Sequence, residues 1–77
     1  MKREFLRTLR RARYLTQKRA AAKSGITQQS WNAWEDGRYK SGMRVDVLLM
    51  IADGLNADPM ELLREEARYL IAREAKR

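Results

Sequence analysis

A glycine followed two residues later by a threonine, Gly25 and Thr27, constrains the fold of this chain more than any other feature. Glycine enters the left-handed conformation that ends a helix at no steric cost. The Thr27 hydroxyl can accept a hydrogen bond from a free backbone N–H of the next turn, and Ile26 can pack on Trp31. We therefore expect one helix to end here, the chain to turn sharply, and a second helix to begin.

The segments on both sides of this turn have the residues of short helices. Residues 17–24 follow Thr16, a good helix cap, and include three successive alanines. Residues 28–36 are followed by Gly37, which can end the second helix. Two helices joined by a short turn with glycine form a helix-turn-helix, an arrangement whose second helix can enter the major groove of DNA.

Size and composition exclude most enzymatic chemistry. A chain of 77 residues makes one small domain with a thin core. Because it contains no Cys and no His, disulfides, the usual zinc sites, thiol nucleophiles and histidine bases are excluded. We therefore expect no enzyme, no metal and no cofactor. No apolar run approaches the roughly 20 residues that cross a bilayer, and the basic start leads into no signal-peptide core, so we expect a cytoplasmic protein.

The positive charge lies in one half of the chain. Residues 1–44 hold 12 Lys and Arg against 3 Asp and Glu, a net +9, whereas residues 45–77 hold 5 against 7, a net −2. Scattered charge can simply keep a small domain soluble. Charge concentrated around a helix-turn-helix favours a polyanion, because clustered Lys and Arg release counterions from phosphates. The expected partner is double-stranded DNA.

Apolar residues at helical spacing predict three further helices, over residues 3–14, 44–55 and 59–75. Asp58 and Pro59 give the clearest start signal, an N-cap followed by proline at the first helical position. The residues expected in the core are Phe5, Leu6, Leu9 and Ala12 on the first of these helices, and Val45, Leu48, Ile51, Ala52 and Leu55 on the second. The predicted fold is all-α with five helices.

The last predicted helix is longer than a small core needs. We assign residues 1–63 to the DNA-binding domain and residues 64–77 to a C-terminal extension of this helix. An apolar stripe on the helix would be poorly covered in a monomer, so we expect a homodimer that forms through it. The stripe comprises Leu62, Leu63, Ala67, Leu70 and Ile71, and the last four of these are assigned to the dimer. The alternative is that the extension folds back or frays.

Two tryptophans, Trp31 and Trp34, lie three residues apart on the second helix of the pair. We expect both indoles in the core, where they fill the space that Ala20 and Ala21 leave open. The alternative, stacking on a base, is less favoured because duplex DNA exposes no base faces.

Polar side chains at the start of this helix suit base recognition. Glutamine can pair bidentately with adenine in the major groove, and Gln28 and Gln29 occupy the first turn. Asn32 and Ala33 follow one turn later, where Asn32 can bond a base or phosphate and the Ala33 methyl can meet a thymine methyl. The alternative is that these are ordinary solvated residues.

Dispersed positions from Leu9 to Leu63, about 55 of the 77 residues, carry a family pattern. They are Arg10, Thr16, Gln17, Ala21, Gly25, Thr27, Glu35, Gly37, Ile51, Ala52, Leu55, Leu62 and Leu63. Their order and spacing resemble the Cro/C1-type (XRE-like) helix-turn-helix family, which implies a compact five-helix fold like that of lambda repressor. Residues 25–30 also resemble the recognition segment of lambdoid phage repressors.

The resemblance implies roles for further residues. Gln17 would bond a phosphate and brace Gln28, while Arg10 would pair with Glu35. Cations near the loop after the second helix would contact the DNA backbone. The full set expected at phosphates is Gln17, Lys18, Arg38, Lys40 and Arg44.

Three departures from the family pattern matter. Alanine replaces a large aliphatic residue at position 20, and tryptophans replace aliphatic residues at positions 31 and 34. Ala33 can make no hydrogen bond at a position that reads bases in some relatives. The loop over residues 38–44 is about three residues longer than in the lambdoid repressors.

These features together predict a sequence-specific regulator, a repressor of phage or mobile-element type. It would act by occupying a pseudo-palindromic operator as a homodimer, with half-sites about one helical turn apart. The alternative is an antitoxin-type regulator that binds DNA and also a partner toxin through a surface such as the last helix. A pure protein-interaction module would leave the +9 segment and the glutamine pair unexplained.

Overall fold

The computed structural model describes residues 1–76, and in that range the chain forms five helices and no strand. The helices are α1 (Glu4–Ala12), α2 (Gln17–Ser24), α3 (Gln28–Asp36), α4 (Val45–Gly54) and α5 (Pro59–Ala75). This confirms the all-α, five-helix prediction. The bounds of α2, α3 and α5 are those predicted, whereas α1 and α4 are shorter at both ends.

The predicted caps explain why these segments become helices. Thr16 and Thr27 accept hydrogen bonds from the backbone N–H groups of Arg19 and Ser30 at 3.1 and 3.0 Å. Between α2 and α3, Gly25 has a left-handed backbone with φ of 73°, so the turn occurs where the sequence predicts it. Helix α1 ends early because Tyr14 adopts a φ of 57°, which the spacing of apolar residues does not reveal.

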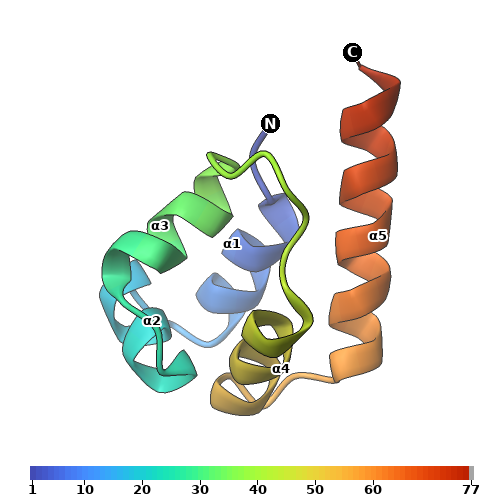
Figure 1. Ribbon diagram of the computed structural model, residues 1–77. Helices are drawn as coiled ribbons and strands as arrows, with labels where there is room; N and C mark the ends of the chain where they lie inside the picture. The colour runs from blue at the N-terminus through green and yellow to red at the C-terminus, as the bar shows by residue number, and fades with distance from the viewer. Residues whose placement is uncertain (77) are drawn as a thin grey trace.

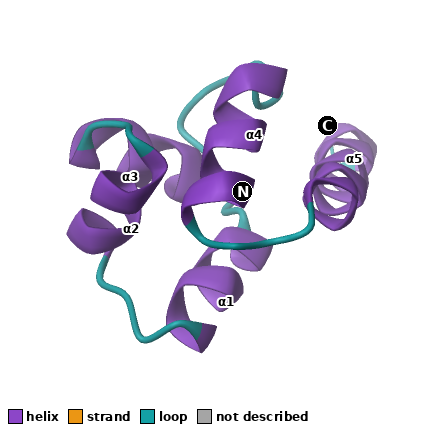
Figure 2. Cartoon of the chain, turned by 90° about the horizontal axis from the view of Figure 1, so that it is seen from below, coloured by secondary structure: helices purple, strands orange, loops and turns teal. Residues whose placement is uncertain are grey.

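The helix-turn-helix lies at the edge of the molecule. Figure 1 shows α2 and α3 at one side and α5 at the other, with α1 and α4 between them. Seen from below, α4 keeps its place between the α2–α3 pair and α5 (Figure 2). Helix α2 packs on both α3 and α4, while α4 packs on α5. The exposed side of α3 therefore lies away from α5.

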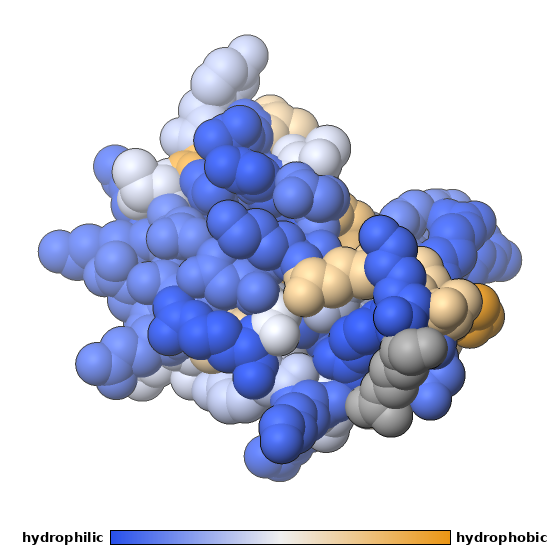
Figure 3. All heavy atoms as spheres, turned by 90° about the horizontal axis from the view of Figure 1, so that it is seen from above, coloured by the Kyte–Doolittle hydropathy of each residue, from blue (hydrophilic) through white to orange (hydrophobic). Residues whose placement is uncertain are grey.

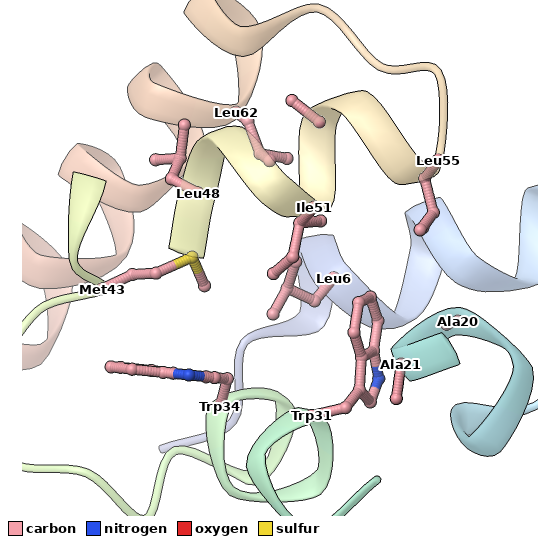
Figure 4. Close-up of a cluster of buried hydrophobic side chains, with 11 residues drawn as sticks. Leu6, Ala20, Ala21, Trp31, Trp34, Met43, Leu48, Ile51, Leu55 and Leu62 are labelled. Carbon is pink, nitrogen blue, oxygen red and sulfur yellow. The ribbon is translucent and has the colours of Figure 1, made fainter. Parts of the chain in front are cut away.

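The two tryptophans are buried, but they have different neighbours. Trp31 is fully buried, and its indole stands beside Ala21 with Leu6 on the other side (Figure 4), as expected if it compensates for small residues on α2. The indole of Trp34 extends towards Met43 instead, away from the alanines. The prediction that both indoles fill the space above α2 is therefore wrong for Trp34.

Two residues expected in the core are exposed. Val45 is 68% exposed at the first position of α4, where Leu48 is the first buried residue. Ala12 is exposed in the last turn of α1, where it lines an open groove.

The buried face of α5 differs from the predicted stripe. Its buried residues are Leu62, Glu66 and Tyr69, whereas Leu63 is 44% and Ile71 is 71% exposed. Leu70 is half-buried, with its side chain beside Gly42. Beyond residue 63, Glu66, Tyr69, Leu70 and Arg73 contact the rest of the domain.

An arginine close to the start of the chain, Arg3, holds α5 against the end of α3. It is fully buried, and its Nε and Nη2 donate to the Glu66 carboxylate at 2.8 and 2.9 Å. Its Nη1 donates to the Trp34 carbonyl at 3.0 Å, and its guanidinium lies over the rings of Trp34 and Tyr69. Glu66 also accepts from the backbone N–H of Met43 at 2.7 Å. One buried ion pair thus joins the N-terminal segment, α3, the loop before α4 and α5.

Candidate nucleic-acid interface

The carboxylate of Glu35 accepts hydrogen bonds from α1 and from both helices of the helix-turn-helix, α2 and α3. Arg10 of α1 donates through Nε and Nη2 to both carboxylate oxygens, at 2.9 and 3.0 Å. Gln17 of α2 donates to one oxygen at 2.8 Å, and the indole N–H of Trp31 donates to the other at 2.9 Å. The Arg10–Glu35 ion pair that the family resemblance implies is therefore present. It fixes α3 relative to α1 and α2.

Burial and hydrogen bonding act in opposite directions on Glu35. Burial alone would raise the pKa of its carboxyl, but hydrogen bonds from Arg10, Trp31 and Gln17 hold the pKa below its ordinary value. The hydrogen bonds to the Glu35 carboxylate and its negative charge raise the pKa of Arg10, although burial opposes the rise. The pair is thus charged at neutral pH.

Gln17 contacts a different residue from the one expected. Its side chain is half-buried and its amide N–H₂ donates to Glu35, whereas the structure shows no bond between Gln17 and Gln28 within the described chain. The reason is that the Glu35 carboxylate lies within reach of the start of α2 and is the stronger acceptor. Gln17 was expected to orient Gln28 at the start of α3. Instead it holds α3 near its C-terminal end, through Glu35.

The predicted base-reading residues differ in what they present to solvent. Gln28 and Gln29 are exposed at the start of α3, and their side chains make no hydrogen bond within residues 1–76. Asn32 is half-buried, and its Oδ1 is a buried atom without a partner in the described part of the chain. Ala33 is only 8% exposed, so little of its methyl group is available for a thymine.

The predicted phosphate-binding cations lie on the surface. Lys18 and Lys40 are exposed, while Arg38 pairs with Asp36 at 3.0 Å and Arg44 pairs with Asp46 at 2.8 Å. Because exposed ion pairs contribute only about 0 to 1 kcal/mol, both guanidinium groups can exchange their carboxylates for a phosphate.

The loop that carries these cations is held at both sides. The ring of Tyr39 packs on Trp34 with a centroid distance of 4.3 Å. Arg73 of α5 donates to the carbonyl oxygens of Tyr39 and Lys40, at 3.2 and 2.7 Å. The longer loop is therefore anchored between the end of α3 and α5.

Sequence reasoning missed several residues that position α3. Arg3, Glu66 and Tyr69 gave no signal, because their contacts join segments more than 60 residues apart. The Trp31–Glu35 hydrogen bond was detectable, since a spacing of four residues brings two side chains together on one helix face.

Within the described residues, no helix combines the length and the apolar character that a membrane span needs.

A search of curated proteins and a search of solved structures both gave no match for this chain. A family model of the helix-turn-helix domain matches residues 3–67. This match spans all of α1 to α4, the first half of α5 and the hydrogen-bonded cluster around Glu35. The chain therefore belongs to the helix-turn-helix domain family, a family of DNA-binding domains.

Proposed function

We propose that this protein is a transcriptional regulator that binds a specific sequence of double-stranded DNA, with the start of α3 in the major groove. The observation that carries the proposal is the exposed pair Gln28 and Gln29 at the start of a helix whose other face is fixed by Trp31 and Glu35. A rigid helix with free amides at its N-terminal turn matches the geometry by which glutamine reads adenine. Asn32 is half-buried one turn later, and we propose its amide N–H₂ as a further contact, because its Oδ1 is buried and does not face the DNA.

The phosphate contacts are proposed for Lys18 on α2, for Arg38, Lys40 and Arg44 around the following loop, and for the half-buried Gln17. The net +9 of residues 1–44 supports this assignment, because phosphate contacts supply most of the affinity that does not depend on sequence. Ala33 is left out of the proposed contacts because it is buried.

We further propose that the regulator acts as a homodimer. Leu63, Ala67 and Ile71 are exposed on one face of α5, spaced by four residues. From above, hydrophobic atoms gather at the edge formed by α5, beside its C-terminal end (Figure 3). Leu70 is left out because it faces Gly42 of the same chain. A two-fold dimer on a pseudo-palindromic operator would repress by occupancy, as in repressors of phages and mobile elements.

The base-reading role is tested with Gln28→Ala. On an operator selected from random duplexes, this change should weaken binding by about 1 to 3 kcal/mol, with little effect on unrelated DNA. The matched variant Lys40→Ala should weaken binding to both DNAs, because a phosphate contact carries no sequence information. Equal losses on both DNAs for Gln28→Ala would refute base reading by this residue.

A second candidate is a DNA-binding antitoxin whose α5 binds a toxin. The exposed Leu63 and Ile71 favour it, since a toxin can cover this apolar face as well as a second copy can. Such a regulator should co-purify with a small protein encoded beside it, in a complex that Ile71→Asp disrupts. A pure homodimer with no second component would rule the antitoxin out.

A further inference from the structure

A groove of about 620 Å³ runs between α1 and the start of α5, away from the helix-turn-helix. Its apolar lining comes mainly from half-buried Phe5 and Leu9 on α1 and from Leu62 on α5. The loop that joins α4 to α5 closes one end, and Figure 2 shows α1 beside this loop, which leads into the start of α5. The groove thus has two helical walls and an apolar floor.

The rim of this groove is acidic in a chain that is strongly basic. Four carboxylates line it, those of Glu4, Asp58, Glu61 and Glu65, against a single cation, Arg13. The Arg13 guanidinium donates to the backbone carbonyls of residues 55 and 56, and so it is bound to the loop between α4 and α5. The residues that line the groove therefore carry a net charge of −3, although Arg7, Arg64 and Arg68 pair with three of these carboxylates from just outside it.

The rim carboxylates are available to a partner. Glu4, Glu61 and Glu65 pair with arginines one turn along their own helices, at 3.6, 3.3 and 2.7 Å, and all of these pairs are exposed. Exposed pairs of this kind contribute little, so an incoming cation can compete for the carboxylates.

A second copy of this chain does not fit the groove in a closed dimer. Ala67, at the centre of the exposed apolar face of α5, lies two residues from Glu65, which places them about 200° apart around the helix. If that face of a second copy filled the groove, the contact would join two different surfaces and would build a ring of several copies or an open chain rather than a two-fold dimer. A dimer formed through Leu63 and Ile71 leaves the groove free.

We propose that this groove docks a basic amphipathic helix of a partner protein. The partner's apolar side chains, spaced one turn apart, would cover Phe5, Leu9 and Leu62, and its flanking Lys and Arg would pair with Glu4, Glu61 and Glu65. Because the groove and the exposed side of α3 lie on different parts of the molecule, the protein can hold DNA and this partner together. The partner site does not depend on the DNA assignment.

The probe is a labelled synthetic helix of about 14 residues, roughly four turns, with leucines on one face and Lys and Arg beside them. A twin peptide carries Glu in place of every Lys and Arg. Binding to the full chain is measured by fluorescence anisotropy, and the contact surface by amide chemical shifts. The basic peptide should bind and shift amides of residues 4–13 and 56–65, while the acidic twin should not bind.

Two double variants with equal charge changes locate the site. Glu61→Lys with Glu65→Lys reverses the charge of two residues that line the groove. Asp46→Lys with Asp53→Lys reverses the charge of two exposed residues on α4. The first double variant should bind the basic peptide at least about tenfold more weakly than the second, a difference in binding free energy of about 1.4 kcal/mol. Equal affinity for both variants, shifts confined to other helices, or failure of the basic peptide to bind would overturn the proposal. A dimer lost in the first variant alone would show that the groove contacts a second copy instead.

Discussion

At the scale of single residues, Glu35 has the most demanding environment in the interface. It receives four hydrogen bonds, from side chains of α1, α2 and α3, while almost all of its surface is buried. A buried carboxylate with this many donors is stable only when it is ionised. The orientation of α3 therefore depends on the charge of one residue.

This dependence predicts a loss of stability in acid. The pKa of Glu35 is lower in the folded chain than its ordinary value of 4.5, so its contribution is present above about pH 4.5 and is lost as pH falls through the folded value. In urea unfolding, Glu35→Gln should cost about 3 to 5 kcal/mol at pH 7, and the gap in unfolding free energy to wild type should narrow as pH falls through the folded pKa, below 4.5. Glu61→Gln, at an exposed pair, should change stability by less than about 1 kcal/mol at any pH. A gap that stays constant with pH would contradict the account.

At the scale of elements, the fold depends on a short N-terminal segment as much as on its helices. Arg3 joins the end of α3 to α5, and the Tyr69 hydroxyl donates to the Met1 carbonyl at 2.6 Å. The backbone N–H of Arg3 also donates to the Glu35 carbonyl at 2.8 Å. These bonds hold α5 and the C-terminal end of α3 in fixed positions.

Removing one partner of the Arg3–Glu66 pair should be more damaging than removing both. Arg3→Met leaves the Glu66 carboxylate buried without its cation and should cost about 3 to 5 kcal/mol in chemical denaturation. The double variant Arg3→Met with Glu66→Leu should recover most of that loss, because no unpaired charge remains. As a control, Arg68→Met breaks an exposed pair and should cost at most about 1 kcal/mol. A double variant no more stable than Arg3→Met would contradict this explanation.

The helices were predictable because their signals are local. Thr16, Thr27 and Asp58 cap the helices that directly follow them, and Gly25 turns the chain at its own position. The packing of α5 was not predictable, since a charged residue such as Glu66 is buried only when a cation from the far end of the sequence reaches it. The exposure of Gln28 and Gln29 could be predicted from their place at the start of α3. The burial of Ala33 and the contact of Gln17 with Glu35 in place of Gln28 could not, because both depend on how the helices pack.

At the scale of the whole molecule, three separate surfaces are proposed to bind partners. The start of α3 is proposed for DNA, the exposed apolar face of α5 for a second copy, and the acidic groove beside α1 for a basic helix. Figure 1 shows α3 and α5 on opposite sides, so these surfaces can be changed one at a time.

The dimer surface is tested by charging it. Leu63→Asp with Ile71→Asp should yield a folded monomer by analytical ultracentrifugation, since both side chains are exposed and contribute little to the core. Operator affinity should fall with the loss of the second half-site. As a control, Tyr14→Asp changes an almost fully exposed residue just after α1, outside the proposed dimer face, and should leave the dimer intact. A wild-type chain that sediments as a monomer at micromolar concentration would rule this dimer out.

The most direct test of DNA recognition by α3 is selection of bound duplexes from a random pool by the full chain. The account predicts enrichment of one pseudo-palindromic sequence, with half-sites about one helical turn apart and adenines at positions where Gln28→Ala relaxes the preference. A pool without any enriched sequence, or an enriched sequence that Gln28→Ala and Gln29→Ala leave unchanged, would contradict it.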